Sequence, residues 1–204
     1  MLLKPMMPEP SGRALPADDD RLLRARAGDG AAFADLVRRH QAMVFSLALR
    51  IIGNRAVAEE LAQDVFLQLH RSLSTLESGA HVAHWLRRVV SHRSIDAARQ
   101  HGRRPQASLE GVPEPGVSGR ETDPLIARRL RLLVAELPPA PRAVITLRFQ
   151  EDLDPSDIAQ VLDMPVNTVK SHLRRALAVL RGRVEAFMAS PGGVMEPDGH
   201  VHRG

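Results

Sequence analysis

The chain has 204 residues, of which 44% are apolar and only 3% aromatic, so it has room for one ordinary domain or two small ones built mainly from helices. It contains no cysteine, which excludes disulfides, cysteine-based zinc sites and thiol nucleophiles and suits a cytoplasmic protein. The net charge is +4, and residues 21–104 hold 14 Lys and Arg against 7 Asp and Glu. Such a basic helical block suits a polyanion such as nucleic acid, although a solvated Arg-rich face is the more common explanation.

Three segments lack helical periodicity and are rich in Pro or Gly: residues 1–17, 102–122 and 189–204. They predict a disordered N-terminal tail, a flexible linker and a disordered C-terminal tail, the last with a regulatory role as the alternative. The linker, if fully extended, would span up to roughly 70 Å. The N-terminus has no apolar run of signal-peptide length, and no segment approaches the roughly 20 apolar residues that span a bilayer, so we expect neither secretion nor membrane insertion.

Residues 18–101 predict an N-terminal helical bundle. A short helix over about 19–27 precedes a long one, in which apolar residues from Phe33 to Ile51 recur at steps of three and four and Gly53 supplies the stop. A second long helix is predicted over about 56–70, and a third begins after Ser78-Gly79.

Residues 123–188 predict a second helical domain. Asp123-Pro124 is typical of an N-cap followed by a first-turn proline, and this helix runs to Leu137. Three prolines then prevent its continuation, and a further helix ends at about Phe149.

The segment 154–181 has the pattern of a helix-turn-helix. Asp154 caps a short helix whose first residue is Pro155, and Asp163-Met164-Pro165 turns the chain. The core side of the second helix is predicted to hold Val166, Val169, Leu173, Ala176, Leu177 and Leu180. Its outer face presents donors that reach base edges and phosphates in a major groove, namely Thr168, Lys170, Ser171, His172, Arg174 and Arg175. The alternative is an ordinary helical hairpin with a solvated basic face.

This segment and the preceding ELPPAPRAVITLRFQEDLDPSDIAQVL resemble the C-terminal promoter-binding domain of extracytoplasmic function (ECF) sigma factors. FADLVRRHQAMVFSLALRII, AEELAQDVFLQLHRSL and HWLRRVVSHRSIDAARQ resemble successive parts of the family's other domain, so the likeness covers about residues 20 to 185. It implies an all-α bacterial transcription initiation factor without enzyme activity, cofactor, metal or small-molecule substrate. Its implied partners are core RNA polymerase, promoter DNA and an anti-sigma factor, and its regulon a stress or envelope response.

The resemblance also assigns roles to individual residues. Those implied to bind core polymerase are Glu60, Gln63, Asp64 and Phe66. The alternatives are a core position for Phe66 and simple solvation for the acidic side chains. The loop 75–81 matches the segment that captures an unstacked promoter base. Contacts to the proximal promoter element are implied for Leu76, Trp85, Arg87, Arg88, His92, Arg93 and Arg99. For Trp85 we favour a core position, with a role in melting as the alternative, and the arginines would follow the backbone of the opened strand.

The chain departs from the family pattern at several positions. His92 stands where Asn is usual, which puts base choice there in doubt, and His172 replaces a usual Arg. Asp163 and Asn167 stand where Gly is common, but both residue types tolerate left-handed or capping geometry.

Two other classes of protein compete with this interpretation. TVKSHL also resembles the recognition helix of two-component and quorum-type regulators, but such a protein needs a receiver or ligand-binding domain upstream. An enzyme would need a phosphate-binding loop, a nucleophile motif or paired metal ligands, none of which the sequence contains. The run Asp18-Asp19-Asp20 is more typical of a solvated helix start than of a metal site, and His81 with His84 lacks a matching third ligand.

Overall fold

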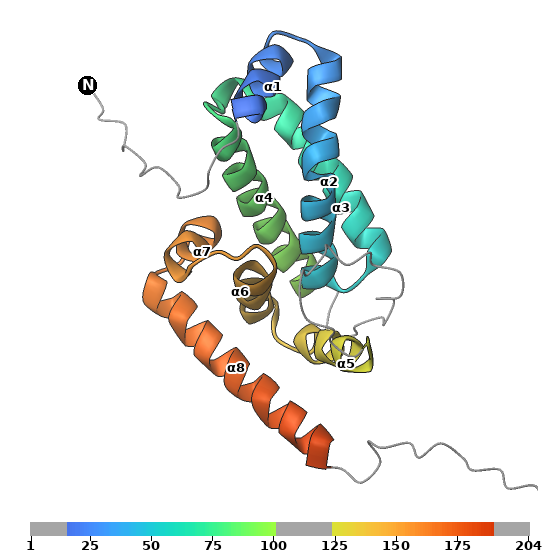
Figure 1. Cartoon of the computed structure of the whole chain (residues 1–204), viewed down its shortest axis with the longest axis vertical. Helices are drawn as coiled ribbons and strands as arrows, with labels where there is room; N and C mark the ends of the chain where they lie inside the picture. The colour runs from blue at the N-terminus through green and yellow to red at the C-terminus, as the bar shows by residue number, and fades with distance from the viewer. Residues whose placement is uncertain (1–15, 101–123, 190–204) are drawn as a thin grey trace, which may run out of the picture.

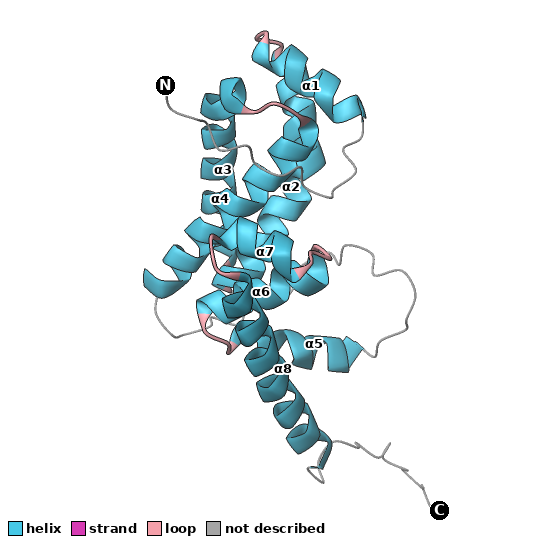
Figure 2. Cartoon of the chain, turned by 90° about the vertical axis from the view of Figure 1, so that its left-hand side faces the viewer, coloured by secondary structure: helices cyan, strands magenta, loops and turns pink. Residues whose placement is uncertain are grey.

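The computed structural model describes residues 16–100 and 124–189, and within these ranges the secondary structure is entirely helical (Figures 1 and 2). The helices are α1 (Pro16–Arg26), α2 (Gly30–Ile52), α3 (Arg55–Ser72), the 3-10 turn η1 (Leu73–Thr75), α4 (Gly79–Gln100), α5 (Pro124–Ala135), α6 (Pro139–Gln150), α7 (Pro155–Leu162) and α8 (Val166–Ala189). The all-α prediction is confirmed. The predicted linker over 102–122, Asp123 and nearly all of both predicted tails lie outside the described residues.

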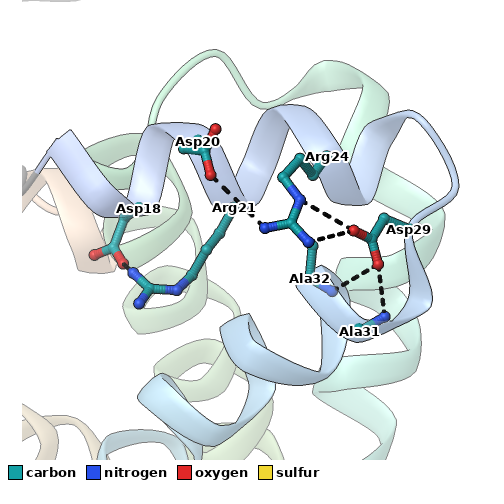
Figure 3. Close-up of polar contacts among 7 residues, drawn as sticks. All are labelled: Asp18, Asp20, Arg21, Arg24, Asp29, Ala31 and Ala32. Atoms are coloured by element: carbon teal, nitrogen blue, oxygen red, sulfur yellow. Dashed lines mark hydrogen bonds and ion pairs between the residues drawn. The ribbon is translucent and has the colours of Figure 1, made fainter.

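Helix α2 is the centre of the N-terminal bundle, and α1, α3 and α4 pack around it (Figure 1). Its first turn is capped by Asp29, whose carboxylate accepts hydrogen bonds from the backbone N–H groups of Ala31 and Ala32 at 2.9 and 3.1 Å. Arg24 donates to the same carboxylate (Figure 3). The Ala32 hydrogen bond and the Arg24 contact hold the pKa of Asp29 below its ordinary value. At the other end, Gly53 adopts φ 78° and its N–H donates to the Leu49 carbonyl, so the predicted stop is confirmed.

The acidic run at the start of α1 is not simply a solvated helix start. Asp18 is buried, and its carboxylate contacts Arg39 Nε at 2.7 Å and Arg21 Nη1 at 3.1 Å. Asp19 accepts a hydrogen bond of 2.6 Å from the backbone N–H of Gly79, the first residue of α4. These contacts hold the beginnings of α1 and α4 together, and only Asp20 has the largely exposed side chain that the sequence predicts.

The hydrophobic core continues from the N-terminal bundle into the C-terminal helices. Val144 and Leu147 of α6 and Ile158 and Leu162 of α7 belong to the same buried cluster as the core of α2, α3 and α4. A second cluster joins α5, α6 and α8 through Leu133, Leu137, Ile145, Ala176 and Leu180. Helix α6 therefore packs against α2 and α4, α7 packs against α4, and α8 extends away from the bundle (Figures 1 and 2).

Arg142 of α6 forms a buried polar contact across this boundary. Its guanidinium donates to the carbonyl of Ala135, the last residue of α5, and at 2.7 Å to the carbonyl of Leu137 in the α5–α6 connection. It also donates to the Ile51 carbonyl of α2 at 2.8 Å. At the last residue of α6, Gln150 Nε2 donates to Ser46 Oγ of α2 at 2.6 Å. Burial lowers the pKa of Arg142 from its ordinary value.

Helices α7 and α8 form the predicted helix-turn-helix. Asp154 accepts hydrogen bonds from the N–H groups of Ser156 and Asp157 at 2.7 and 2.9 Å, and Pro155 is the first residue of α7. Asp163, which ends α7, adopts the left-handed conformation with φ 53°, as its residue type permits. One core prediction is wrong: Leu177 is 41% exposed, because α8 beyond its first turns is covered only on the side that bears Ala176 and Leu180.

None of the helices in the described ranges has the length and apolar character needed to cross a membrane.

Candidate functional site: an acidic helix face and two basic ones

The outer surface of α3 carries three of the four predicted polymerase-binding residues. Glu60, Gln63 and Asp64 are all exposed, and their spacing puts them on one side of the helix. Leu67, three residues beyond Asp64, continues the row and is 58% exposed. We call Glu60, Gln63, Asp64 and Leu67 the α3 face. Phe66 is half-buried and packs against the core, as its alternative interpretation predicts.

Sequence periodicity contains a signal for Leu67. The buried stripe of α3 consists of Ala58, Leu61, Ala62, Val65 and Leu69, and Leu67 lies off it. Periodicity therefore predicts that Leu67 is an exposed apolar side chain on the surface of α3.

An ion pair joins the α3 face to α4. Arg93 Nη2 lies 2.7 Å from Asp64 Oδ2, and both side chains are partly exposed. The structure thus brings together one residue predicted to bind polymerase and one predicted to bind DNA.

The arginines of α4 differ in what holds them. Arg87 Nε donates to Glu151 Oε2 at 2.9 Å, and the Glu151 side chain is only 9% exposed. Arg88 donates to the Gln160 carbonyl at 3.2 Å and lies 3.4 Å from the Asp163 carboxylate. Arg99 is exposed and pairs with its helix neighbour Asp96 at 3.2 Å. Arg87 and Arg88 therefore contact the C-terminal helices, whereas Arg93 and Arg99 stay within the N-terminal bundle.

The other predicted proximal-element residues lie near or in the core. Trp85 is half-buried and packs against the core, and His92 is half-buried with its Nε2 enclosed and without a hydrogen-bond partner among the described residues. Leu76 is only 1% exposed, so in this conformation its side chain belongs to the core and cannot contact DNA. The neighbouring Thr75 and Glu77 are exposed, so the loop itself remains accessible.

Two histidines, His81 and His84, lie in the first turns of α4, the helix against which α7 packs. His81 Nδ1 accepts a hydrogen bond of 3.4 Å from the Glu77 N–H. Burial is the main cause that lowers the pKa of His84, with smaller contributions from the neighbouring His81, Arg88 and Arg87 and an opposing effect of Asp157. Within the described ranges no group of three potential metal ligands occurs, so this pair has no third ligand.

The outer row of α8 is open to solvent. Thr168, Lys170, Arg174 and Arg175 are exposed, and Ser171 and His172 are half-buried. We call these six residues the α8 outer face. Partial burial and the neighbouring Arg175 lower the pKa of His172. A row of cationic and hydroxyl donors on the second helix of a helix-turn-helix has the chemistry of a duplex-reading surface.

Comparison with known proteins identifies both halves of this structure. Residues 36–104 match the family model "Sigma-70 region 2", and residues 127–180 match "Sigma-70, region 4". A region 2 unit followed by a region 4 unit defines a sigma-type transcription initiation factor. This match also disfavours the two-component regulator, since the N-terminal half is a sigma domain rather than a receiver.

Similarity over most of the chain narrows the class. The ECF RNA polymerase sigma factor SigM of Mycobacterium tuberculosis is 31% identical over 169 residues, which cover 83% of this chain and 85% of SigM. SigW of Bacillus subtilis, also an ECF RNA polymerase sigma factor, is 27% identical over 79% of this chain and 93% of its own length. The chain belongs to the ECF family of RNA polymerase sigma factors.

Solved structures support the fold. CnrH, determined in complex with the cytosolic domain of CnrY, has a TM-score of 0.62 at 24% identity, over 83% of this chain and 98% of CnrH. The sigma factor RpoE from Bartonella quintana, determined with the anti-sigma factor NepR, has a TM-score of 0.58 at 21% identity, over 75% of this chain and 96% of RpoE.

Proposed function

We propose that this chain binds core RNA polymerase and directs it to promoters whose distal element is read by the α8 outer face. The observation that carries the proposal is the exposed row of Lys170, Arg174 and Arg175, which make no ion pair with any other described residue, on a helix-turn-helix that follows a region 2 unit. Direct contacts to base edges would supply sequence choice, and arginine contacts to phosphates would make the affinity salt-dependent.

The α3 face supports the polymerase-binding part of the proposal. It combines carboxylate and amide groups with one exposed leucine, a composition that fits a mixed polar and apolar protein interface. Glu60, Gln63 and Asp64 would make the polar contacts, and Leu67 would add an apolar one. Phe66 would contribute indirectly, because its side chain packs α3 against the core and so fixes the position of the α3 face.

Helix α4 supports binding of the opened proximal element. Arg87, Arg88, Arg93 and Arg99 would hold the strand backbone, and the exposed loop around Thr75 and Glu77 would approach the flipped base. No covalent chemistry, cofactor or metal enters this mechanism, and a factor of this kind would act in the cytoplasm beside the polymerase.

An anti-sigma factor is the further partner that we propose. The solved CnrH structure includes the cytosolic domain of CnrY, and that of RpoE includes the anti-sigma factor NepR. A regulator of this type would cover the surfaces proposed here for polymerase and DNA.

Run-off transcription tests the proposal. Purified core polymerase is incubated with a pool of promoter fragments, with and without the full chain, and we expect discrete start sites only when the chain is present. Arg175→Ala should weaken these starts and reduce the slope of log affinity against log salt by about 1. Arg183→Ala is the matched control, because Arg183 lies on the same helix but pairs with Glu136 of the α5–α6 connection.

The alternatives give different results. If core polymerase does not respond while the chain alone selects a duplex site, a stand-alone regulator is the better account. If Arg175→Ala and Arg183→Ala behave alike, the α8 outer face does not read the promoter.

A further inference from the structure

The C-terminal helices contact α2 and α4 through two kinds of interaction. The inner part consists of the shared apolar cluster and the Arg142 contact to the Ile51 carbonyl, which are buried, and of the partly buried Gln150 contact to Ser46. The outer part is a rim of acceptors around two arginines of α4, formed by Glu151, Asp163 and the Gln160 carbonyl.

The rim acceptors resemble a nucleic-acid backbone in charge. Glu151 and Asp163 each present a carboxylate to a guanidinium, and Asp157 of α7 is close enough to affect the pKa of His84 on α4. A guanidinium that donates to a carboxylate has those donors occupied, so a phosphate must displace the carboxylate before it can bind. Glu151 is the stronger competitor, since its side chain is 9% exposed and lies 2.9 Å from Arg87.

We propose that α6, α7 and the loops that flank α7 act as a built-in acidic competitor for the single DNA strand on α4. This inference rests on the proposed function for Arg87 and Arg88. In the conformation described here, the C-terminal unit occupies these two arginines, and the opened promoter strand gains them only after α6 and α7 have moved away from α4.

The competition affects one DNA surface and not the other. Lys170, Arg174 and Arg175 are exposed in the same conformation in which Arg87 and Arg88 are held. In this conformation, which we call closed, the chain should therefore bind duplex DNA through α8 while it binds a single strand weakly. Strand binding would become effective when a partner, with core polymerase as the one proposed above, stabilises the separated arrangement.

The test uses a variant that weakens the rim without touching the predicted DNA-binding residues. Glu151→Gln/Asp163→Asn removes both rim carboxylates, and Asn tolerates the left-handed conformation at 163. The control is Asp152→Asn/Glu136→Gln, which removes the same amount of charge from the same unit. Its carboxylates pair with Arg148 and Arg183, which belong to the C-terminal helices.

Two quantities are measured on the full-length chain. Because the chain has no cysteine, Leu23→Cys and Val184→Cys introduce a single pair of labels on exposed positions of α1 and α8, and their separation reports closure. Fluorescence anisotropy with a short single-stranded oligonucleotide pool reports strand binding. We expect the rim variant to populate longer label distances and to bind the strand about 5-fold to 30-fold more tightly than the control.

Each outcome decides a separate point. Equal distances and equal strand affinities for the rim variant and the control would overturn the inference. Longer distances without tighter strand binding would also overturn it, because the carboxylates would then hold the units together without competing with DNA. If both shifts occur but no form of the chain starts transcription with core polymerase, the proposed function fails and the competition stands. Glu151→Gln alone is the second variant, in case the double variant does not fold.

Discussion

Replacement of Arg142 by Met tests how much stability the buried guanidinium provides. Met retains much of the apolar stem, but the carbonyls of Ile51, Ala135 and Leu137 lose their donor. A buried acceptor without a partner costs about 1–3 kcal/mol, so three of them set an upper range of about 3–9 kcal/mol. Arg142 has no carboxylate partner among the described residues, and removal of such a buried cation offsets this loss by several kcal/mol. We therefore expect Arg142→Met to lower the free energy of unfolding by about 2–4 kcal/mol.

The measurement is urea unfolding followed by helical circular dichroism. With a urea dependence of about 2 kcal/mol per molar, a loss of this size lowers the midpoint by about 1–2 M. Arg142→Lys should fall between wild type and Arg142→Met, because an ammonium group has no planar fork to contact several carbonyls together. Arg183→Met, at an exposed position paired with Glu136, is the control and should change stability by less than about 0.5 kcal/mol.

A loss below about 1 kcal/mol for Arg142→Met would refute this reasoning, since it would mean that the three carbonyls find other donors or water once the guanidinium is gone. An equal loss for Arg142→Lys and Arg142→Met would show that the fork geometry, and not the charge, provides the stability.

Three further predictions concern the remaining contacts. A Cβ at Gly79 would lie 2.4 Å from Asp18 Cβ, so Gly79→Ala should lower the melting temperature. A Cβ at Gly30 would have no atom within 4 Å, so Gly30→Ala should leave the melting temperature unchanged or raise it. A similar drop for both variants would contradict this account. Asp154→Ala removes the α7 cap and should cost about 1 kcal/mol in urea unfolding, and no change would show that Ser156 and Asp157 need no acceptor. Burial lowers the pKa of His40 and of His84 in the folded chain below 6.5, the ordinary pKa of histidine. As the pH falls through this range, these histidines therefore bind protons in the unfolded chain before they do so in the folded one. Stability should therefore decrease from pH 7.5 towards acid, and His40→Gln should flatten this dependence in urea unfolding; an unchanged slope would exclude His40 as a contributor.

Local signals in the sequence predicted the helix ends well. The cap at Asp154 with Pro155 and the stop at Gly53 depend on a few neighbouring residues, so they are visible without tertiary information. Asp18 shows the limit of such signals. Its burial depends on Arg39, which is 21 residues away and completes the charge pair on a different helix.

Contacts between the two sigma units had no local signal. The apolar stripes of α6 and α7 indicate that Val144, Leu147, Ile158 and Leu162 are buried, but periodicity does not say against which helix they are buried. The partners of Arg87 and Arg88 lie 64 and 75 residues further along the chain. At sequence level these arginines and carboxylates have the character of solvated charges, so α4 could be predicted as a basic face but its occupation by the C-terminal unit could not.

The composition of the boundary favours reversible separation of the two units. Arg142 retains the Ala135 and Leu137 carbonyls when α6 leaves α2, because both belong to its own unit, and only the Ile51 carbonyl passes to water. Ser46 and Gln150 are polar groups that water can solvate, and the rim arginines exchange carboxylates for phosphates. The cost of separation is therefore concentrated in the apolar surface that α2 and α4 share with α6 and α7. A partner that covers this surface after separation would lower the cost further, so strand binding on α4 should depend on such a partner more strongly than duplex binding on α8 does.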